Sequence, residues 1–438
     1  MKNEIVSFFF AALMTLTTTG AWAQKQVDGV YQIGSADDLT GFATLVNGGG
    51  VSASAALTSD IDMSGLEWTG MTGYTGQFDG NGKCIRNLAG PLFAQTGDGV
   101  TIKNLTLEGA ISRDEGSNFG AFIADHQGTN LTMVNCVNKT DVSAPASANV
   151  GGFVGRLYNG SAAATFRFTD CVNDGAVTGA DATGGFVGID ETNNTGWGLY
   201  FTNCTNNGNI TGAVGTGGFF GQSYHAEPTT YSFNNGNVTS TSEGAGGIAG
   251  YVRRSQQLIE NFVNTGAVSA VNSAGGFVGA EWRSGAPQFI INIHDSYNAG
   301  TVSVTGNSAG GFVGKQLGSS SSYTNVYNSW NIGKISGGES AAFMGHGKIS
   351  RFYNCFNTGA VEGTSTSAVF LAWSEYGFEA RNCWNIGEVG IVAAKADNVK
   401  RATAIYDLSG CKVADVNAQN GKLPKGIYVV NGKKLLVR

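Results

Sequence analysis

The pentapeptide Gly-Gly-Phe-Val-Gly at residues 151–155 returns unchanged at residues 184–188, 275–279 and 310–314, with looser copies between and beyond them. Aligned on the phenylalanine, the copies form an apolar column whose members lie 26 to 35 residues apart, with a mean of about 31. The column contains Phe122, Phe153, Phe186, Phe219, Ile248, Phe277, Phe312, Phe343 and Val369. The chain is therefore built around nine regular repeats, and the repeat decides the fold.

A second block, Asn-Cys-x-Asn-x-Gly-x-Val, recurs with the same period. The second asparagine of this block is present in all nine copies: Asn138, Asn173, Asn206, Asn234, Asn264, Asn298, Asn331, Asn357 and Asn385. Glycine stands two residues later in every copy except the first, which has Thr140, and a β-branched residue stands two further on. Short apolar runs separated by glycine, without helical periodicity, are typical of a parallel β-solenoid. We expect an all-β fold, a right-handed parallel β-helix of about nine regular coils of ~31 residues.

Each column of the repeat has an expected place in a coil. The phenylalanines should point inward and stack from coil to coil. The asparagines should occupy a turn, because Asn tolerates positive φ, and their amides should bond to one another as a ladder. The glycine two residues later should relieve the same corner. The residue after each phenylalanine is also apolar, as in Val154 and Val187. This second column should lie at a bend or face outward, in which case the following loop would cover it.

The composition agrees with a turn-rich β protein. The 438 residues include 67 Gly but only 5 Pro, and 42% are hydrophobic, which is enough to bury a core. Only 13% are charged, and 26 basic against 32 acidic residues give a net charge of −6. Nothing in this balance favours a nucleic-acid partner.

The N-terminus predicts export. An apolar run from Ile5 to Leu16 precedes Ala21-Trp22-Ala23, a small-x-small cleavage pattern, so we expect a signal peptide over 1–23 and a mature chain from Gln24. The run is too short to span a bilayer as a helix. The predicted location is therefore secreted or on the outer cell surface, with no transmembrane segment.

The ends of the repeat region differ from the repeats. Residues 24–119 should contain a helical cap, beginning at Ser35 and carrying Leu39, Phe42 and Val46 on one face, followed by irregular first coils. The regular repeats span 120–392. Residues 400–438 should form a small separate β module in which 427–437 is a hairpin turning at Asn431-Gly432.

Cysteine shares one repeat position with serine. Cys136, Cys171, Cys204, Cys355 and Cys383 alternate there with serines and one phenylalanine, which indicates a small buried slot. Disulfides and a metal site are the alternatives to free stacked thiols. In-register neighbours are spaced more widely than a disulfide prefers, and no CxxC or histidine-rich spacing is present. We expect free thiols, no metal and no cofactor.

Two segments resemble known families. The Gly-Gly-Phe-Val-Gly repeats, with Phe78-Asp-Gly-Asn-Gly82 and Ile102-Lys-Asn-Leu105 before them, resemble the GLUG-motif repeats of secreted bacterial surface proteins over residues 30–390. That resemblance implies an adhesin, or the non-catalytic region of an immunoglobulin A-cleaving metallopeptidase. Residues 406–438 resemble a type IX secretion C-terminal sorting domain, with Cys411 replacing the usual basic residue, and imply secretion machinery as a partner.

Catalytic motifs are scarce. No HExxH sequence is present, and Gly306-Asn-Ser308-Ala-Gly310 lacks the strand-to-helix elbow that a nucleophilic serine needs. Asp170 and Asp295 share a repeat column four coils apart, roughly 19 Å, which is too far for paired carboxyls. We predict a non-enzymatic adhesion protein that binds host or matrix glycans or proteins. The alternative is a polysaccharide lyase or glycoside hydrolase of the parallel β-helix type.

Any binding site should lie on the variable loops of the third to sixth coils, because function in repeat proteins usually sits where loops vary. The loop charges, including Asp190, Glu191, Glu227, Glu281 and Lys315, are expected to form a solvated face. The predicted ligand-binding strip consists of Trp197, Tyr200, Tyr224, His225, Tyr251, Arg253, Arg254, Trp282 and Arg283. Aromatic rings and flanking arginines suit sugars and carboxylates. Alternatively, the aromatic side chains fold back to cover the second apolar column.

Overall fold

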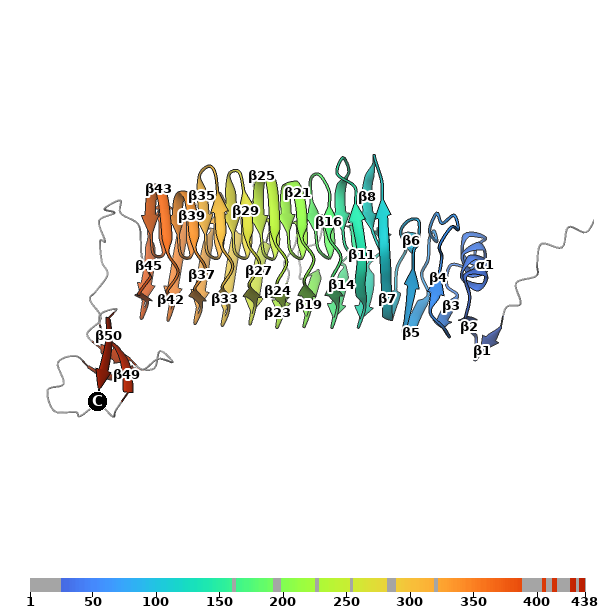
Figure 1. The fold of residues 1–438 in the computed structure, drawn as a ribbon, viewed down its shortest axis with the longest axis horizontal. Helices are drawn as coiled ribbons and strands as arrows, with labels where there is room; N and C mark the ends of the chain where they lie inside the picture. The colour runs from blue at the N-terminus through green and yellow to red at the C-terminus, as the bar shows by residue number, and fades with distance from the viewer. Residues whose placement is uncertain are drawn as a thin grey trace, which may run out of the picture.

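Each coil contributes strands to two long parallel sheets that run the length of the molecule (Figure 1). The computed structural model describes residues 25–159, 163–191, 198–224, 228–252, 255–281, 289–318 and 322–387, with four further strands between residues 404 and 437. Neighbouring coils pair in register, as where Phe166 and Phe168 of one coil align with Leu199 and Phe201 of the next. The predicted parallel β-helix of about nine coils is confirmed.

A coil turns at one residue with positive φ, which we call the corner residue. The strands that lead up to it, the pre-corner strands, are β10 (Asn130–Val134), β14 (Thr165–Thr169), β19 (Leu199–Thr202), β23 (Pro228–Thr230), β27 (Ser255–Glu260), β32 (Phe289–His294), β37 (Tyr323–Tyr327), β41 (Ile349–Tyr353) and β45 (Phe378–Arg381). The strands that follow it, the post-corner strands, are β11 (Val137–Ser143), β15 (Val172–Asn173), β20 (Thr205–Asn206), β24 (Phe233–Asn234), β28 (Val263–Asn264), β33 (Tyr297–Asn298), β38 (Trp330–Asn331), β42 (Phe356–Asn357) and β46 (Trp384–Asn385).

The coil then extends into an arm that folds back on itself. The outgoing arm strands are β8 (Ser117–Gly120), β12 (Ala148–Gly151), β16 (Val177–Thr178), β17 (Thr183–Gly184), β21 (Ile210–Gly217), β25 (Val238–Gly246), β29 (Val268–Ala270), β30 (Ser273–Gly275), β34 (Val302–Val304), β35 (Ser308–Gly310), β39 (Ile335–Ala341) and β43 (Val361–Ala368). The returning strands form the second sheet: β6 (Phe93–Thr96), β9 (Ile123–Gln127), β13 (Val154–Tyr158), β18 (Val187–Asp190), β22 (Phe220–Ser223), β26 (Ala249–Val252), β31 (Val278–Glu281), β36 (Val313–Lys315), β40 (Met344–Gly347) and β44 (Leu371–Ser374).

Phenylalanines stack along the centre of the rod. The ring centroids of Phe122 and Phe153 lie 4.8 Å apart, those of Phe153 and Phe186 also 4.8 Å, and those of Phe186 and Phe219 4.9 Å. All four side chains are fully buried. The inward phenylalanine column predicted from the sequence is therefore confirmed, and it supplies a continuous core.

The second apolar column lies at a bend, which was one of its two predicted places. The chain bends at Gly152 and Phe153, before strand β13, and the bend turns both Phe153 and Val154 into the core. Val154, Val187 and the other members are buried. No loop is needed to cover this column, because it does not face outward.

The prediction that the conserved asparagines occupy the turn is wrong. Positive φ falls three residues earlier, at the corner residues, which are Asn135, Asp170, Asn203, Tyr231, Asn261, Asp295, Asn328, Asn354 and Asn382. Asn138 and its equivalents lie instead in the post-corner strands and point into the core. The glycine two residues later has no positive φ either. It is needed because a Cβ at Gly208 would lie 1.9 Å from the carbonyl oxygen of Gly175 in the preceding coil.

The asparagine amides form an inner ladder through the core. Nδ2 of Asn138 donates to Oδ1 of Asn173 at 2.8 Å, Asn173 donates to Asn206 at 2.8 Å, and this continues coil by coil to Asn385. Each Nδ2 group donates its other hydrogen to the backbone carbonyl oxygen two residues later in the same coil, as from Asn173 to Gly175 at 3.0 Å. Both amide hydrogens are used, so a buried polar column is tolerated.

The N-terminal end has the predicted helical cap. Helix α1 (Ala36–Asn47) begins at Ser35, whose Oγ accepts a hydrogen bond from the backbone N–H of Asp38 at 3.1 Å. The helix buries its own side chains Leu39, Phe42 and Val46. Strands β1 (Gln26–Val27) and β2 (Val30–Ile33) precede the helix. The irregular coils between the helix and the first regular repeat contain β3 (Ser54–Leu57), β4 (Ile61–Asp62), β5 (Gln77–Arg86) and β7 (Val100–Ser112).

The last four strands form an antiparallel sheet of their own. They are β47 (Ala404–Tyr406), β48 (Lys412–Asp415), β49 (Gly426–Val430) and β50 (Lys433–Val437). Strands β49 and β50 pair as the predicted hairpin, with Val430 opposite Lys433. The predicted turn at 431–432 and the predicted signal peptide over 1–23 lie outside the described residues.

Candidate functional site

Aromatic side chains gather on the outside of the last regular coils, on both sides of the corner. The post-corner position that faces solvent carries Tyr297, Trp330, Phe356 and Trp384 in four consecutive coils. The last pre-corner position carries His294, Tyr327 and Tyr353 in three consecutive coils. We call these seven side chains the aromatic platform. They lie toward the orange end of the rod in Figure 1, on the strands from β32 to β46.

The post-corner side of the platform is a row of partly exposed rings, which we call the post-corner ladder. The rings of Tyr297 and Trp330 are stacked, with centroids 5.1 Å apart and planes 5° from parallel. Trp330 is 39% exposed, and Ile332, two residues later on the same outward face, is 47% exposed. In earlier coils the same position holds the smaller side chains Val172, Thr205 and Val263, with a single ring at Phe233. An unbroken run of large rings at this position is therefore a feature of the last coils.

The pre-corner side repeats this arrangement. The rings of His294 and Tyr327 are stacked at 4.7 Å, and those of Tyr327 and Tyr353 at 5.2 Å. The Tyr353 hydroxyl donates to the carboxylate of Glu379 at 3.0 Å. In-register parallel pairing holds equivalent residues one coil apart, close to the stacking distance of aromatic rings. The strand register therefore forces the rings into ladders.

Corner amides lie between the two aromatic ladders. Nδ2 of Asn354 donates to Oδ1 of Asn328 at 2.9 Å, and Nδ2 of Asn382 donates to Oδ1 of Asn354 at 3.3 Å. All three asparagines are exposed. The platform thus combines ring edges with polar groups that recur once per coil.

The cations around the platform are already engaged. Arg381 forms an ion pair with Glu379, and Lys334 forms one with Glu362 at 2.8 Å. Arg351 lies over the ring of Tyr323, 5.1 Å from its centroid, and donates to the side chain of Asn325. The exposed Asp295 at the neighbouring corner adds a negative charge. The surface has apolar rings and amides but little free positive charge.

The platform is a run of partly exposed apolar rings on consecutive coils. Contiguous exposed apolar side chains on a soluble protein usually mark an interaction site. The phenol, indole and imidazole edges also carry hydrogen-bonding atoms.

The binding strip predicted on the variable loops is only partly described. The side chains of Trp197, His225, Arg253, Arg254, Trp282 and Arg283 lie outside the described residues. Tyr200 is on pre-corner strand β19, where the guanidinium of Arg167 lies 4.3 Å from its ring centroid. Tyr224 follows strand β22 and is partly exposed. Tyr251 is on strand β26 of the other sheet, so the described members do not share one strand or one sheet.

Tyr251 is buried, with 3% of its surface exposed. Its ring packs over Gly215 and Gly244 in the arms, where an added Cβ would come within about 3 Å of ring atoms. Burial and a hydrogen bond with Glu243 raise the pKa of its hydroxyl. This side chain covers the glycine turns of the arm.

Two of the loop carboxylates expected to be solvated are buried, so that expectation is wrong for them. Asp190 has no exposed surface and accepts a hydrogen bond from Ser223 at 3.4 Å. Glu281 is 5% exposed and accepts the backbone N–H groups of Leu317 at 3.1 Å and Gly318 at 2.7 Å. Burial raises the pKa of Glu281 to about 7. Both are the last residues of returning strands, β18 and β31, and both point into the interior.

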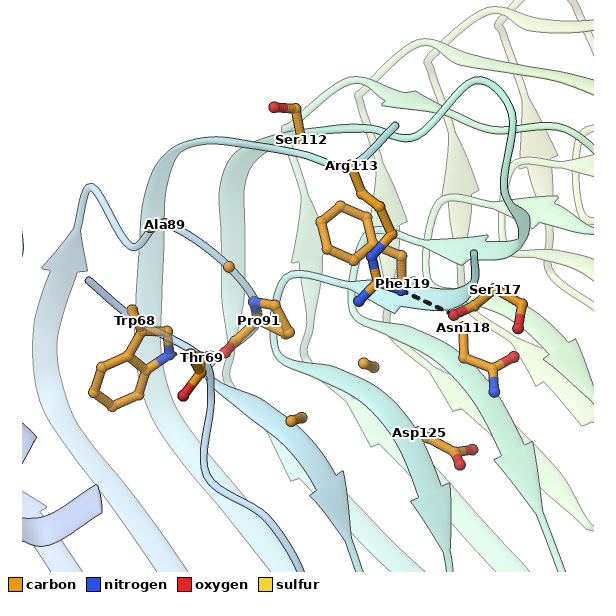
Figure 2. A pocket seen from close by; sticks show the side chains of 13 residues that line it. Trp68, Thr69, Ala89, Pro91, Ser112, Arg113, Ser117, Asn118, Phe119 and Asp125 are labelled. Carbon is orange, nitrogen blue, oxygen red and sulfur yellow. Dashed lines mark hydrogen bonds between the residues drawn. The ribbon is translucent and has the colours of Figure 1, made fainter. Parts of the chain in front are cut away.

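A hollow of about 490 Å³ lies where the arms begin (Figure 2). Trp68 and Pro91 line one side, and the indole N–H of Trp68 donates to the Pro91 carbonyl at 2.8 Å. On the other side, Arg113 donates to the carbonyl of Ser117 at 3.0 Å and lies 4.7 Å from the ring centroid of Phe119.

Strand β8 is the first outgoing arm strand and pairs with β12 on one side. Arg113 therefore covers a strand edge at this hollow. Asp125, at the rim, is held by Arg156 through two hydrogen bonds of 2.8 and 2.9 Å. The charged groups of the hollow are satisfied within the protein, so we assign it a structural role.

The cysteine column is buried and its thiols face backbone carbonyls. Sγ of Cys171 donates to the carbonyls of Met133 at 3.6 Å and Thr169 at 3.3 Å. Cys136 and Cys204 make equivalent contacts, and burial raises the pKa of both thiols. Within the residues that the structure describes, no three metal-ligating side chains cluster.

No protein-family model matches this chain, and no curated protein matches it significantly. Among solved structures, it is similar to a candidate immunoglobulin A1 protease from Bacteroides ovatus, at 20% identity over 70% of this chain and 77% of that one, with a TM-score of 0.38. In the described part of the chain, no helix is long and apolar enough to cross a bilayer.

Proposed function

We propose that this protein is a non-enzymatic secreted or surface-displayed β-solenoid that binds glycans and so mediates adhesion. The observation that carries the proposal is the aromatic platform, an array of partly exposed rings that recur in consecutive coils on both sides of the exposed corner amides. The GLUG-like repeats and the predicted signal peptide support the same reading. The sorting-domain-like C-terminus supports delivery to the outer surface.

The carboxylates supply little support for catalysis. Asp170 accepts a hydrogen bond from Asn203 at 2.6 Å and stands at a corner far from Asp295. Asp125 and Glu191 both contact Arg156 and form a structural ion network. Glycoside hydrolysis needs two carboxyls ~5–9.5 Å apart, one of them free to transfer a proton.

The test is a binding array of glycans and matrix proteins probed with the mature protein from Gln24. We expect binding to glycans and its loss in the double variant Tyr297→Ala, Trp330→Ala. The same glycans should be incubated with the protein and assayed for new reducing ends and for unsaturated products. Reproducible turnover would replace this proposal with the polysaccharide-degrading alternative, and binding to protein spots alone would replace the ligand class.

A further inference from the structure

Resting on the proposed function, we infer that the post-corner ladder binds a neutral, unbranched polysaccharide lying parallel to the axis of the rod, with one sugar unit on each coil. The ladder consists of Tyr297, Trp330, Phe356 and Trp384. Its repeat, its polar tips and the charge around it favour this ligand.

The ladder repeats at the spacing of parallel strands, ~4.8 Å per coil. A ligand that meets all four rings in the same way must also repeat at about this interval. A pyranose unit in an extended, unbranched chain is close to this length, so each coil can meet one unit. The irregular surface of an ordinary globular protein has no such translational repeat.

The chemistry of each step fits a sugar. The rings of Tyr297 and Trp330 stack at 5.1 Å with nearly parallel planes, so each ring covers much of the other and presents its outer edge to solvent. That edge is a carbon–hydrogen surface with one polar group, the hydroxyl of Tyr297 or the indole N–H of Trp330. The corner amides of Asn328 and Asn354 recur beside it. A sugar offers the matching alternation of C–H groups and hydroxyls.

The charge distribution favours a neutral chain over an acidic one. Lys334 and Arg381 are neutralised by Glu362 and Glu379. Asp295 is exposed at the first corner beside the ladder. A polyuronate or sulfated glycan would meet a negative charge at this end and would have to break existing ion pairs to gain a cation.

The first experiment measures affinity against ligand length. Neutral β-linked oligosaccharides of two to eight units are titrated into the mature protein by calorimetry, with oligogalacturonates of the same lengths in parallel. We expect affinity to rise with each added unit up to four and then to level off, because four coils carry rings. Oligogalacturonates should bind at least tenfold more weakly.

The second experiment uses matched variants. Trp330→Ala, in the middle of the ladder, should weaken binding of the four-unit ligand at least tenfold and abolish the rise beyond two units. Phe233→Ala is the control, because Phe233 occupies the same position and is 39% exposed, but lies between Thr205 and Val263 outside the ladder. It should bind like the unmodified protein. Thermal melting and circular dichroism of both variants confirm that each is folded.

Other results would overturn the inference in distinguishable ways. Tighter binding of oligogalacturonates, or affinity independent of length, would contradict the neutral chain on four coils while leaving glycan binding intact. Failure to bind any glycan would contradict the proposed function as well. If sedimentation velocity instead showed a dimer that Trp330→Ala dissociates, the ladder would be an interface between copies of this chain.

Discussion

At the scale of the residue, the inner asparagine ladder accounts for the strictest position of the repeat. Each amide donates to the next coil, donates to its own chain and accepts from the coil before it. Asn206, for example, contacts Asn173, Asn234 and Gly208. An asparagine side chain has the length and the two donors that this geometry requires. A substitution therefore leaves partners unpaired in two coils as well as its own.

We predict that Asn206→Ala lowers the free energy of unfolding by about 2–4 kcal/mol, because Asn173 and Asn234 each lose a buried hydrogen-bond partner. Denaturant unfolding followed by circular dichroism measures the loss. The control is Asn207→Ala, which removes two exposed hydrogen bonds, one donated to Asp174 and one accepted from Asn235, and should cost less than about 1 kcal/mol. Equal losses in the two variants would contradict a special role for the ladder.

Glu281 gives a prediction about pH. Burial raises its pKa from 4.5 to about 7, so between these values the folded protein holds a proton that the unfolded chain has released. Stability contributed by this group is thus present below about pH 4.5 and is lost as pH rises through about 7. Glu281→Gln should therefore gain stability relative to the unmodified protein as pH rises from 5 to 8, by up to about 3 kcal/mol.

Melting temperatures of the two proteins at pH 5, 6, 7 and 8 measure this difference. Glu362→Gln serves as the control, because Glu362 is an exposed ion-pair partner of Lys334 and should show a small, flat difference. A difference for Glu281→Gln that does not change with pH would show that the carboxyl is charged throughout.

At the scale of the element, the close stacking of the post-corner turns depends on glycine. Successive turns approach so closely that a Cβ at Gly236 would lie 1.9 Å from the carbonyl oxygen of Gly208. The strands on both sides are fixed by pairing, so neither turn can move away alone. This explains why glycine fills the position in eight of nine repeats.

Gly236→Ala should therefore destabilise the protein by more than about 3 kcal/mol, because backbone of two coils must shift. Gly90→Ala is the control, since the nearest atom to a Cβ there is the Trp68 carbonyl oxygen at 3.4 Å, an ordinary contact. Hydrogen exchange read by mass spectrometry should show increased exchange in the coils around residue 236. Normal protection there would contradict the steric account.

The structural role of a repeat position could be predicted from the sequence where a single physical requirement selects its residue type. The phenylalanine column and the cap at Ser35 were predictable because burial and N-capping each select few residue types. The corner was misplaced by three residues because Asn recurs at both Asn135 and Asn138, and only the backbone distinguishes the strained position from the buried one. A search for large aromatic residues between the Cys or Ser and the Asn of the second block would have found Trp330, but its stacking depends on the register.

At the scale of the whole molecule, the rod needs protection at its ends, because each end exposes core and unpaired strand. Helix α1 supplies this at the N-terminal end. The Phe42 ring lies 6.2 Å from Tyr74 and 6.3 Å from Phe78, measured between centroids, and closes the aromatic core. The cap is thus part of the fold and also a barrier to association.

Phe42→Asp should lift the helix from the first coil and cause concentration-dependent self-association, because a buried charge in place of a ring is not tolerated. Sedimentation velocity at several concentrations measures the association. Thr44→Asp, on the exposed side of the same helix, should remain like the unmodified protein. If the Phe42 variant stayed in its original association state, the helix would not be what shields this end.

The inner ladder also bears on how such a chain changes over generations. Each coil accepts a hydrogen bond on one side and donates an identical one on the other, so its two surfaces are complementary to each other. A gene segment encoding one coil can then be duplicated or lost in tandem, and the new neighbours meet as the old ones did. Length becomes a heritable variable separate from the fold, and the number of rings along the outside can change one coil at a time.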